Sequence, residues 1–395
     1  MKEKFLRELA DIQTGPFGSQ LHKEDYVADG TPIVTVEHLG NKMFSEQNLP
    51  RVSNTDKNRL KKYVLKQGDI VFSRVGSVDR CSYVDQKHDG WMFSGRCLRV
   101  RPTSEIDSEY LYYYFCLEET KQFVRNIAVG ATMPSINTKL LGEVVVTFPE
   151  LEQQKRISGI LSAIDSKIEV NQKINDNLEQ QAATYFQELF INNANPVWQI
   201  STISDLGTVV GGSTPSKTKP EYYTNNGIAW ITPKDLSINK SKFISHGEND
   251  ITELGLKNSS ATVMPKGTVL FSSRAPIGYI AIASNEVTTN QGFKSVIPYS
   301  EIGTAFVYFF LKHSLPVIES AASGSTFKEI SGSAMKNIPA IIPDRNTLDQ
   351  FNSFCAPIFA QQKILEEQNH SLAMLRDSLL PKLMSGAIDI ASIQL

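Results

Sequence analysis

The sequence predicts an α+β protein in which two β-rich globular domains, related by internal duplication, are separated by two long helices that pair as an antiparallel coiled coil. Three observations support this fold class. Four phrases from the first half of the chain recur in the second half, in the same order. Short β-like runs bounded by turn residues dominate both copies. Each copy then closes with apolar residues spaced seven apart, which is typical of a long paired helix.

The composition is that of an ordinary globular protein. The chain has 395 residues, of which 41% are hydrophobic and 21% charged, and this length suggests more than one domain. Residues 1–12 lack the apolar core of a signal peptide, and the longest apolar run, 302–311, is too short to span a bilayer. The cysteines form no C-x-x-C pair and the histidines no H-x-x-x-H pair. We therefore expect a cytoplasmic protein without membrane association or bound metal.

The net charge of −2 hides an uneven distribution. Between Arg51 and Arg101 there are twelve basic and five acidic residues, whereas residues 150–190 hold four basic and seven acidic ones. A locally basic domain is compatible with a polyanionic partner. It is equally compatible with a solvated surface on which basic residues cluster by chance.

The repeat indicates a tandem duplication of a domain-sized unit, because its period is far too long for a solenoid. The matching segments lie 194 to 199 residues apart: 9–12 with 203–206, 30–39 with 227–236, 68–74 with 267–274, and 130–136 with 324–330. The duplication divides the chain into four parts: a first β-rich domain at 1–149, a long helix at 150–192, a second β-rich domain at 193–343 and a second long helix at 344–395.

The strands and inner helices follow from local patterns. Apolar, β-branched runs flanked by Gly, Asn, Asp and Pro predict strands at 31–36, 69–74, 97–102 and 142–149, and at 228–232, 268–273, 279–284 and 295–298. One helix is expected to interrupt each domain, near 108–127 in the first copy and 303–322 in the second.

The closing helices carry the clearest signal. One apolar seam of the first helix comprises Ile157, Ile164, Asn171, Leu178 and Tyr185, with Ile160 and Ile174 filling part of a second seam. The matching seam of the second helix comprises Phe351, Ile358, Leu365, Leu372 and Leu379, with Phe354 and Leu375 beside them. The alternative is that each helix packs only on its own domain. Antiparallel pairing is the simplest arrangement, because each helix leads away from its own copy.

Two similar domains held by paired helices suit a long, periodic target that is read in two places. Duplex DNA fits, because its grooves repeat about every 34–36 Å and paired modules read spaced half-sites. We therefore expect double-stranded DNA with two half-sites as a partner.

Several segments also carry a family resemblance: 148–161 (FPELEQQKRISGIL), 68–74 (GDIVFSR), 130–141 (GATMPSINTKLL) and 196–216 (PVWQISTISDLGTVVGGSTPS). In their order and duplication they resemble the specificity subunit of type I restriction–modification systems, and the likeness covers essentially the whole chain. The resemblance implies two target-recognition domains, each followed by a conserved helix. It also implies a non-catalytic subunit that reads a bipartite, asymmetric DNA site.

The resemblance implies protein partners as well. These would be two methyltransferase (modification) subunits and the motor-nuclease (restriction) subunits. S-adenosylmethionine, ATP and Mg would then be bound by those partners, so no cofactor is expected on this chain. Glu152, Gln153 and Ile157 match the family signature at the start of the first helix and are the candidate partner-binding residues, whereas residues 343–351 of the second helix lack the Glu-Gln pair.

No segment offers convincing catalytic residues. Residues 211–218 imitate a phosphate-binding loop, but Ser216 replaces its last glycine. Residues 325–328 have Ser-x-x-Lys spacing without the companion motifs of a serine acyl-enzyme. Asp165 and Lys167 resemble half of a nuclease motif, yet they lie in the first long helix, where we expect them to face solvent.

Candidate DNA-binding residues lie in polar loops whose side chains suit contacts to bases and phosphates. In the first domain they are Ser19, Gln20, Thr35, Glu37, His38, Arg74, Arg80, Arg96 and Thr132; in the second they are Ser213, Thr214, Lys217, Lys219, Thr232, Lys234, Arg274, Gln291, Lys294 and Lys328. Arg74 and Arg274 follow equivalent strands, so they suit a shared phosphate contact or a structural role in a turn. Base-reading residues are expected where the copies differ, such as Glu37 and His38 against Lys234 and Asp235.

Two other functions remain open at this point. The chain could be a self-contained DNA methyltransferase, although it lacks the cofactor and catalytic motifs of that class. It could instead be a dimeric adaptor that binds only protein, which the basic segment between Arg51 and Arg101 disfavours. Binding of a labelled methyl donor would identify the first function, and failure to bind random duplex DNA would identify the second.

Overall fold

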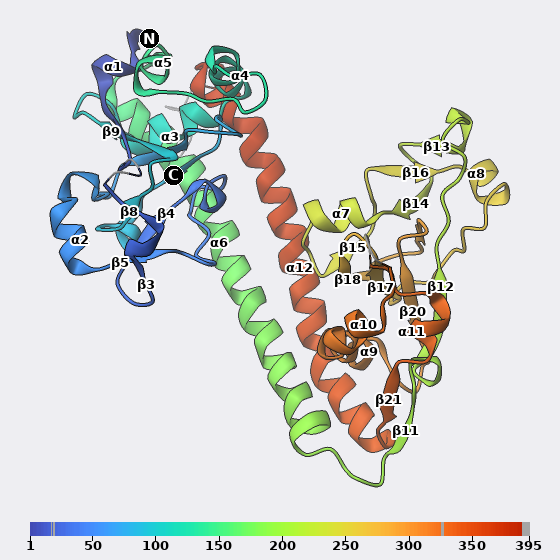
Figure 1. The fold of residues 1–395 in the computed structure, drawn as a ribbon. Helices are drawn as coiled ribbons and strands as arrows, with labels where there is room; N and C mark the ends of the chain where they lie inside the picture. Colours follow the sequence, from blue (N-terminus) through green and yellow to red (C-terminus); the bar gives the residue numbers. More distant parts are fainter. Residues whose placement is uncertain (17, 19, 325–327, 389–395) are drawn as a thin grey trace. The chain divides into compact units, whose positions relative to one another are not determined.

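The computed structural model describes residues 1–16, 18, 20–324 and 328–388 of the chain. It consists of two compact units: unit 1 contains Met1–Glu169 together with the segment that begins at His370, and unit 2 contains Val170–Asn369. Each unit therefore holds one β-rich copy and one part of each long helix, α6 (Leu151–Gln187) and α12 (Arg345–Met384), which are green and red in Figure 1.

The described residues of unit 1 form three small sheets. The first is antiparallel, in the order β2 (Ala10–Thr14), β9 (Cys97–Pro102), β6 (Ile70–Ser73) and β7 (Cys81–Tyr83). The second has the order β3 (Tyr26–Val27), β5 (Arg51–Val52), β4 (Thr31–Val34) and β8 (Met92–Phe93), of which only the last pair is parallel. The third pairs β1 (Lys2–Phe5) with β10 (Val145–Phe148).

Unit 2 repeats these sheets in the same order, which confirms the duplication. The first contains β12 (Gly207–Gly211), β20 (Lys294–Pro298), β17 (Val269–Ser273), β18 (Ile277–Ala283) and an added edge strand, β15 (Phe243–Ile244). The second contains β13 (Tyr223–Thr224), β16 (Asn249–Ile251), β14 (Ile228–Ile231) and β19 (Thr288–Thr289). The third pairs β11 (Gln199–Thr202) with β21 (Pro339–Ile342).

The repeated phrase forms an inner strand of the first sheet in each copy, β6 in unit 1 and β17 in unit 2. Both strands are apolar runs whose residues are all buried, as expected of strands covered on both faces. Gly68 and Gly267 precede them with φ values of 90° and 89°. Glycine adopts this left-handed backbone without steric cost, so the glycine in each phrase supports the turn that leads into the strand.

The shorter helices connect and cover these sheets. In chain order they are α1 (Leu6–Leu9), α2 (Asn54–Arg59), α3 (Ser108–Cys116), α4 (Glu118–Ile127), α5 (Thr138–Gly142), α7 (Pro233–Ile238), α8 (Glu253–Lys257), α9 (Thr304–His313), α10 (Leu315–Ala321) and α11 (Gly332–Lys336). A π-helical turn, Glu188–Asn192, follows α6. None of the helices among the described residues is both long and apolar enough to cross a membrane.

The prediction of a single helix inside each domain is wrong, because each copy has two consecutive helices there. In the first copy Leu117 separates α3 from α4, and its ψ of 134° lies outside the helical region. In the second copy Pro316 lies in the first turn of α10. Proline is tolerated at a helix start but not in its interior, so α9 ends before it.

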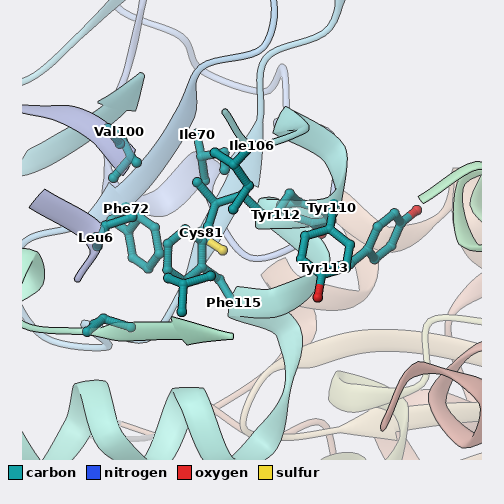
Figure 2. Close-up of a cluster of buried hydrophobic side chains, with 14 of the residues drawn as sticks. Leu6, Ile70, Phe72, Cys81, Val100, Ile106, Tyr110, Tyr112, Tyr113 and Phe115 are labelled. Carbon is teal, nitrogen blue, oxygen red and sulfur yellow. The ribbon is translucent and has the colours of Figure 1, made fainter. Parts of the chain in front are cut away.

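The core of unit 1 forms where α3 packs against the first sheet (Figure 2). The rings of Phe72 on β6 and Phe115 on α3 meet edge to face, with centroids 4.7 Å apart. Ile157 and Leu161 of α6 and Leu380 of α12 belong to the same cluster. Burial of a large apolar side chain contributes roughly 1.5–3 kcal/mol, so this cluster attaches both long helices to the first copy.

The two long helices pair in both units, and in unit 2 they run antiparallel, as predicted. In unit 1, Asp165 of α6 forms an ion pair of 2.8 Å with Arg376 of α12. In unit 2, Asn171 of α6 hydrogen-bonds to Asn369 of α12 at 2.9 Å, and further along α6 Tyr185 lies near Phe351, with ring centroids 5.9 Å apart. Residue numbers therefore rise along one helix as they fall along the other. The superhelical twist of a coiled coil remains a prediction.

The second apolar seam predicted for these helices is wrong at three of its four positions; the fourth, Ile160, is partly buried and packs against the core of unit 1. Ile174, Phe354 and Leu375 are 40%, 40% and 47% exposed. The buried residues on that side lie one position further along each helix: Leu161, Asn175, Ala182, Cys355, Gln362 and Leu383. Because several of them are polar or small, a search for apolar spacing selected their neighbours instead. The first seam is confirmed where Ile157, Asn171 and Phe351 are buried.

Candidate nucleic-acid interface

In unit 1 the predicted loops meet at the ends of the strands, where backbone hydrogen bonds join them. The Ser94 N–H donates to the Val34 carbonyl at 2.9 Å, and the Arg74 N–H donates to the Arg96 carbonyl at 2.8 Å. The Gly76 N–H donates to the Pro134 carbonyl at 2.8 Å. We call the loops joined in this way loop cluster 1; it comprises residues 15–16, 35–38, 74–80, 94–96 and 129–135.

Unit 2 builds the same arrangement with different residues. The Ser213 N–H donates to the Thr289 carbonyl at 2.9 Å, and the Asn290 N–H donates to the Ile231 carbonyl at 3.0 Å. The Ser273 N–H donates to the Gly292 carbonyl at 2.7 Å. These loops form loop cluster 2, which comprises residues 212–219, 232–235, 274–276, 290–294, 322–324 and 328–330. The loops selected from the sequence are thus brought together in each copy.

Two glycines allow the first loop of each copy to pass close to the others. A Cβ atom on Gly15 would lie 2.1 Å from the carbonyl oxygen of Ser94, and one on Gly212 would lie 2.0 Å from that of Asn290. Both distances are shorter than any tolerable contact, so a larger residue at either position would force the loops apart. Backbone packing therefore requires glycine at these two positions.

The structure places most first-domain candidates in loop cluster 1. Glu37, Arg80, Arg96 and Thr132 are exposed, and Thr35 and Arg74 are partly buried. Gln20 is tied to the neighbouring segment, because its side chain accepts a hydrogen bond of 2.7 Å from the Tyr63 hydroxyl. Ser19 lies outside the described residues.

The prediction that His38 reads bases is wrong. Its ring is 1% exposed. Nδ1 accepts a hydrogen bond of 3.0 Å from the Thr35 N–H, and Nε2 lies 3.1 Å from the Gln47 carbonyl. Asp235 has the same place in the second copy: its carboxylate accepts from the Thr232 N–H at 2.7 Å. Both residues hold the turn in shape.

The second-domain candidates gather in loop cluster 2. Lys217, Lys219, Lys234, Gln291 and Lys328 are exposed, whereas Ser213, Thr214, Thr232, Arg274 and Lys294 are partly buried. The Thr214 hydroxyl donates to the Gln291 side chain, and the Ser213 carbonyl accepts from the Trp230 indole N–H at 3.0 Å. The exposed candidates of loop cluster 2 are therefore mostly lysines, and hydrogen bonds hold the loops that carry them.

Arg74 and Arg274 are not equivalent, contrary to the prediction. The Ile136 N–H donates to the Arg74 carbonyl at 2.9 Å, whereas the matching Ile330 N–H donates to the Ser273 carbonyl at 3.0 Å. Ser273 thus stands where Arg74 stands in the first copy. The second phrase contains one extra serine, and the register of β17 against β18 shifts between Phe271 and Ser273.

The two arginines consequently have different surroundings. The Arg74 Nη1 donates to the Gly95 carbonyl at 3.1 Å. The Arg274 Nη1 lies 3.2 Å from Glu329, and the Lys294 Nζ lies 3.6 Å from the same carboxylate. Partly exposed pairs of this kind are weak, so a phosphate could replace Glu329 as the partner of Arg274.

Part of the basic excess between Arg51 and Arg101 serves the fold. Arg99 is buried and pairs with Asp11. The guanidinium of Arg101 lies 2.7 Å from the buried carboxylate of Asp69. These two arginines stabilise the first sheet and do not face a polyanion. The charge surplus in this segment therefore overstates the basic surface of the first domain.

The three candidate partner-binding residues separate into two kinds. Glu152 is 85% exposed at its side chain, and Gln153 is also exposed. Ile157 is 2% exposed and belongs to the core of unit 1. The prediction for Ile157 is therefore wrong, because its side chain is fully used in attaching α6 to the first domain.

Asp165 does not face solvent, contrary to the expectation. Its carboxylate accepts a hydrogen bond of 2.6 Å from the Tyr113 hydroxyl and pairs with Arg376 at 2.8 Å. This carboxylate is therefore engaged in holding α3, α6 and α12 together. Among the residues that the structure describes, no group of three or more His, Cys, Asp or Glu side chains could hold a metal ion.

Sequence reasoning missed two lysines, the partly buried Lys42 and the buried Lys242, that connect each copy to the long helices. The Lys42 Nζ donates to Glu109 at 2.7 Å and to Ser162 of α6 at 2.9 Å. The Lys242 Nζ pairs with Glu179 of α6 and donates to Gln362 of α12 at 2.7 Å. Neither lysine belongs to a repeated phrase, so only the position of Lys242 two hundred residues after Lys42 could have indicated them.

The comparisons with known proteins agree with this architecture. The family model described as "Type I restriction modification DNA specificity domain" matches residues 1–180 and 196–369. The type I restriction enzyme MjaIX specificity subunit of Methanocaldococcus jannaschii is 43% identical over 162 residues, which are 40% of this chain and 37% of that protein. The HindI specificity subunit of Haemophilus influenzae is 24% identical over 407 residues, covering 83% of this chain and 88% of that protein.

A solved structure shows the same fold. The crystal structure of the type I restriction–modification S subunit from M. genitalium aligns with a TM-score of 0.61 at 17% sequence identity, over 97% of this chain and 95% of that chain. The family model covers both copies and most of the chain. The chain therefore belongs to the type I restriction modification DNA specificity family.

Proposed function

We propose that this chain is the sequence-specific DNA-binding subunit of a type I restriction–modification complex, and that each β-rich domain reads one half of a bipartite, asymmetric DNA site. The observation that carries this proposal is the duplicated loop cluster. Backbone hydrogen bonds join the corresponding loops in both copies, at Ser94 and Asn290 for example. The exposed side chains on these frames differ, so the two frames suit two different base sequences.

The chemistry of the exposed residues suits DNA. Both loop clusters contain exposed cations: Arg80 and Arg96 in loop cluster 1, and Lys217 and Lys328 in loop cluster 2. Such side chains bind phosphate oxygens and make bidentate contacts with guanine. Gln291 offers an amide, the group favoured for adenine. The loops therefore supply both the sequence-independent and the sequence-dependent contacts that specific DNA binding needs.

The same proposal assigns the chemistry to partner subunits. Two methyltransferase subunits and the motor-nuclease subunits would assemble on this chain, and Glu152 and Gln153 at the exposed start of α6 are the proposed contact for a methyltransferase subunit. S-adenosylmethionine, ATP and Mg would belong to those partners. We place the complex in the cytoplasm. The named relatives are specificity subunits, which favours neither a self-contained methyltransferase nor a protein-only adaptor.

Selection from a randomised duplex library tests the proposal directly. The full chain, alone and with its methyltransferase subunits, should enrich one motif made of two separated half-sites. Sequencing of methylated bases in a host that carries the system should report the same motif. Binding that depends on salt but enriches no sequence would contradict the proposed specificity. Failure to bind duplex DNA in any arm would favour the protein-only adaptor.

A further inference from the structure

We infer that Glu37 and Lys234 are the same base-reading position in the two copies: Glu37 selects a base with an amino group in the major groove, and Lys234 selects guanine. This inference rests on the proposed DNA-binding function and goes beyond it, because it names two residues and the bases they prefer. The opposite charges of the two side chains would make the two half-sites differ at this position.

The equivalence of the two residues follows from hydrogen bonds. Each follows the third strand of the second sheet, β4 or β14: Glu37 lies in a 3-10 turn, Val36–His38, and Lys234 lies in the first turn of α7. The turn opens with Thr35 in one copy and Thr232 in the other, and three residues later His38 or Asp235 accepts a hydrogen bond from the threonine N–H. Glu37 and Lys234 are both the second residue after that threonine, so each lies between the threonine and the residue that accepts its hydrogen bond.

The same turns are held inside the loop clusters. The carbonyl of Val34, just before the first turn, accepts from Ser94; that of Ile231, before the second, accepts from Asn290. His38 and Asp235 are buried, whereas Glu37 and Lys234 are exposed. Each copy therefore has one exposed side chain at this position, and that side chain differs between the two copies.

Neither side chain is committed to the fold. The carboxylate of Glu37 accepts a hydrogen bond of 3.0 Å from the Thr35 hydroxyl within the same turn. The Lys234 Nζ lies 2.6 Å from Glu248, and both side chains of that pair are more than 60% exposed. Exposed ion pairs are screened by water and salt, so Lys234 can exchange Glu248 for DNA.

The charge of Glu37 identifies the type of contact. Phosphates repel a carboxylate, so an acid at a DNA-facing position gains nothing from the backbone. It gains from base edges that donate a hydrogen bond, of which cytosine N4 is the favoured partner and adenine N6 is a second amino group. Lysine instead donates to the O6 and N7 acceptors of guanine.

The test is selection from a randomised duplex library with the full chain and single substitutions. Glu37→Gln and Glu37→Lys should change the preferred base at one position of one half-site, with Glu37→Lys shifting it toward guanine. Lys234→Glu should shift one position of the other half-site toward cytosine or adenine, and Lys234→Met should abolish the guanine preference there. Each preference should change by about tenfold, which corresponds to the loss of one good base contact.

Matched controls use exposed residues of the same charge outside the loop clusters, Glu119→Gln and Lys266→Met, which should leave the motif unchanged. The inference is overturned if the Glu37 and Lys234 variants keep the parental motif, or if they weaken binding equally on all sequences. It is also overturned if Glu37→Lys alters both half-sites. Enrichment of no motif by the parental chain would instead refute the proposed function on which the inference rests.

Discussion

The side chains of Asn171 and Asn369 hydrogen-bond to each other at 2.9 Å between α6 and α12 in unit 2. Asn171 is completely buried, and its amide oxygen has no hydrogen-bond partner among the described residues. A buried asparagine in an apolar seam lowers stability while it fixes the alignment of paired helices. We therefore expect this pair to fix how the two helices align in unit 2.

We expect Asn171→Leu alone to lower the free energy of unfolding by about 0.5–1.5 kcal/mol, the net contribution of one hydrogen bond, because it removes the bond that the Asn171 amide donates to the side-chain oxygen of the partly buried Asn369. The double variant Asn171→Leu/Asn369→Leu should be more stable than this single variant, because both polar groups are gone. Urea unfolding of the four proteins of the double-mutant cycle measures the coupling. Additive losses would show that the two amides do not interact.

A second prediction concerns the buried ion pair of Lys242 and Glu179. Lys242→Met should destabilise unit 2, by less than the about 3–5 kcal/mol typical of a broken buried pair, because the Lys312 Nζ still lies 2.6 Å from Glu179. Lys336→Met, at an exposed lysine of the same unit, is the control. Equal stability of the Lys242→Met variant and the parental chain would show that the pair contributes nothing.

The same pair predicts a dependence on pH. Burial raises the pKa of Glu179, but Lys242 and Lys312 outweigh it, so the net pKa is lower than usual. A carboxyl group with a lowered pKa stabilises the folded state above its unfolded pKa of about 4.3. This contribution is lost as the pH falls through the folded pKa. The stability gap between the parental chain and Glu179→Gln should therefore be largest near neutral pH and shrink below about pH 4. A gap that is constant with pH would contradict this assignment.

The third prediction tests each of the two arginines that the sequence equated. Arg274→Ala should weaken DNA binding and reduce the slope of log affinity against log salt by about 0.9, the effect of one phosphate contact. Arg74→Ala should behave in the same way if its guanidinium also reaches phosphate. Unchanged affinity with a lower melting temperature would assign either arginine to the turn alone. Equilibrium binding at several salt concentrations and thermal unfolding decide between these outcomes.

The duplication and the loops were predictable because they rest on local chemistry. Repeated Gly-apolar phrases imply repeated strands, and the same strand order follows in both units. Polar, Gly-rich segments between strands imply loops, and similar strands bring similar loops together. The conformation of these parts depends on a few neighbouring residues, so the amino-acid sequence displays it directly.

The parts that could not be predicted depend on contacts between distant residues. An extra serine shifts Arg274 by one position relative to Arg74. The shift is seen in the hydrogen bond that the Ile330 N–H donates to Ser273, where the matching Ile136 N–H donates to Arg74. The second helix seam is partly polar, because the Gln362 side-chain amide donates a hydrogen bond of 3.2 Å to the backbone carbonyl of Asn175. His38 looks like a base-reading residue until its burial is known. Such roles are decided by three-dimensional neighbours, which apolar spacing does not show.

A fourth prediction tests the proposed partner contact. Charge reversal by Glu152→Lys together with Gln153→Lys should impair co-purification with the methyltransferase subunit, while DNA binding by the isolated chain is retained. The control is Gln180→Lys with Gln181→Lys, which adds two charges at exposed positions of the same helix. Normal assembly of the first variant would remove the start of α6 from the proposed interface.

The central claim is that each loop cluster reads its own half-site, and the affinity of the full chain for duplexes with one half-site scrambled tests it most directly. The variant Lys234→Ala/Gln291→Ala/Lys328→Ala alters only exposed residues of loop cluster 2. We expect it to lose sensitivity to one half-site while it still loses affinity when the other is scrambled, and Glu37→Ala/Arg80→Ala/Arg96→Ala should show the reverse. Equal loss of sensitivity to both half-sites in either variant would contradict the account.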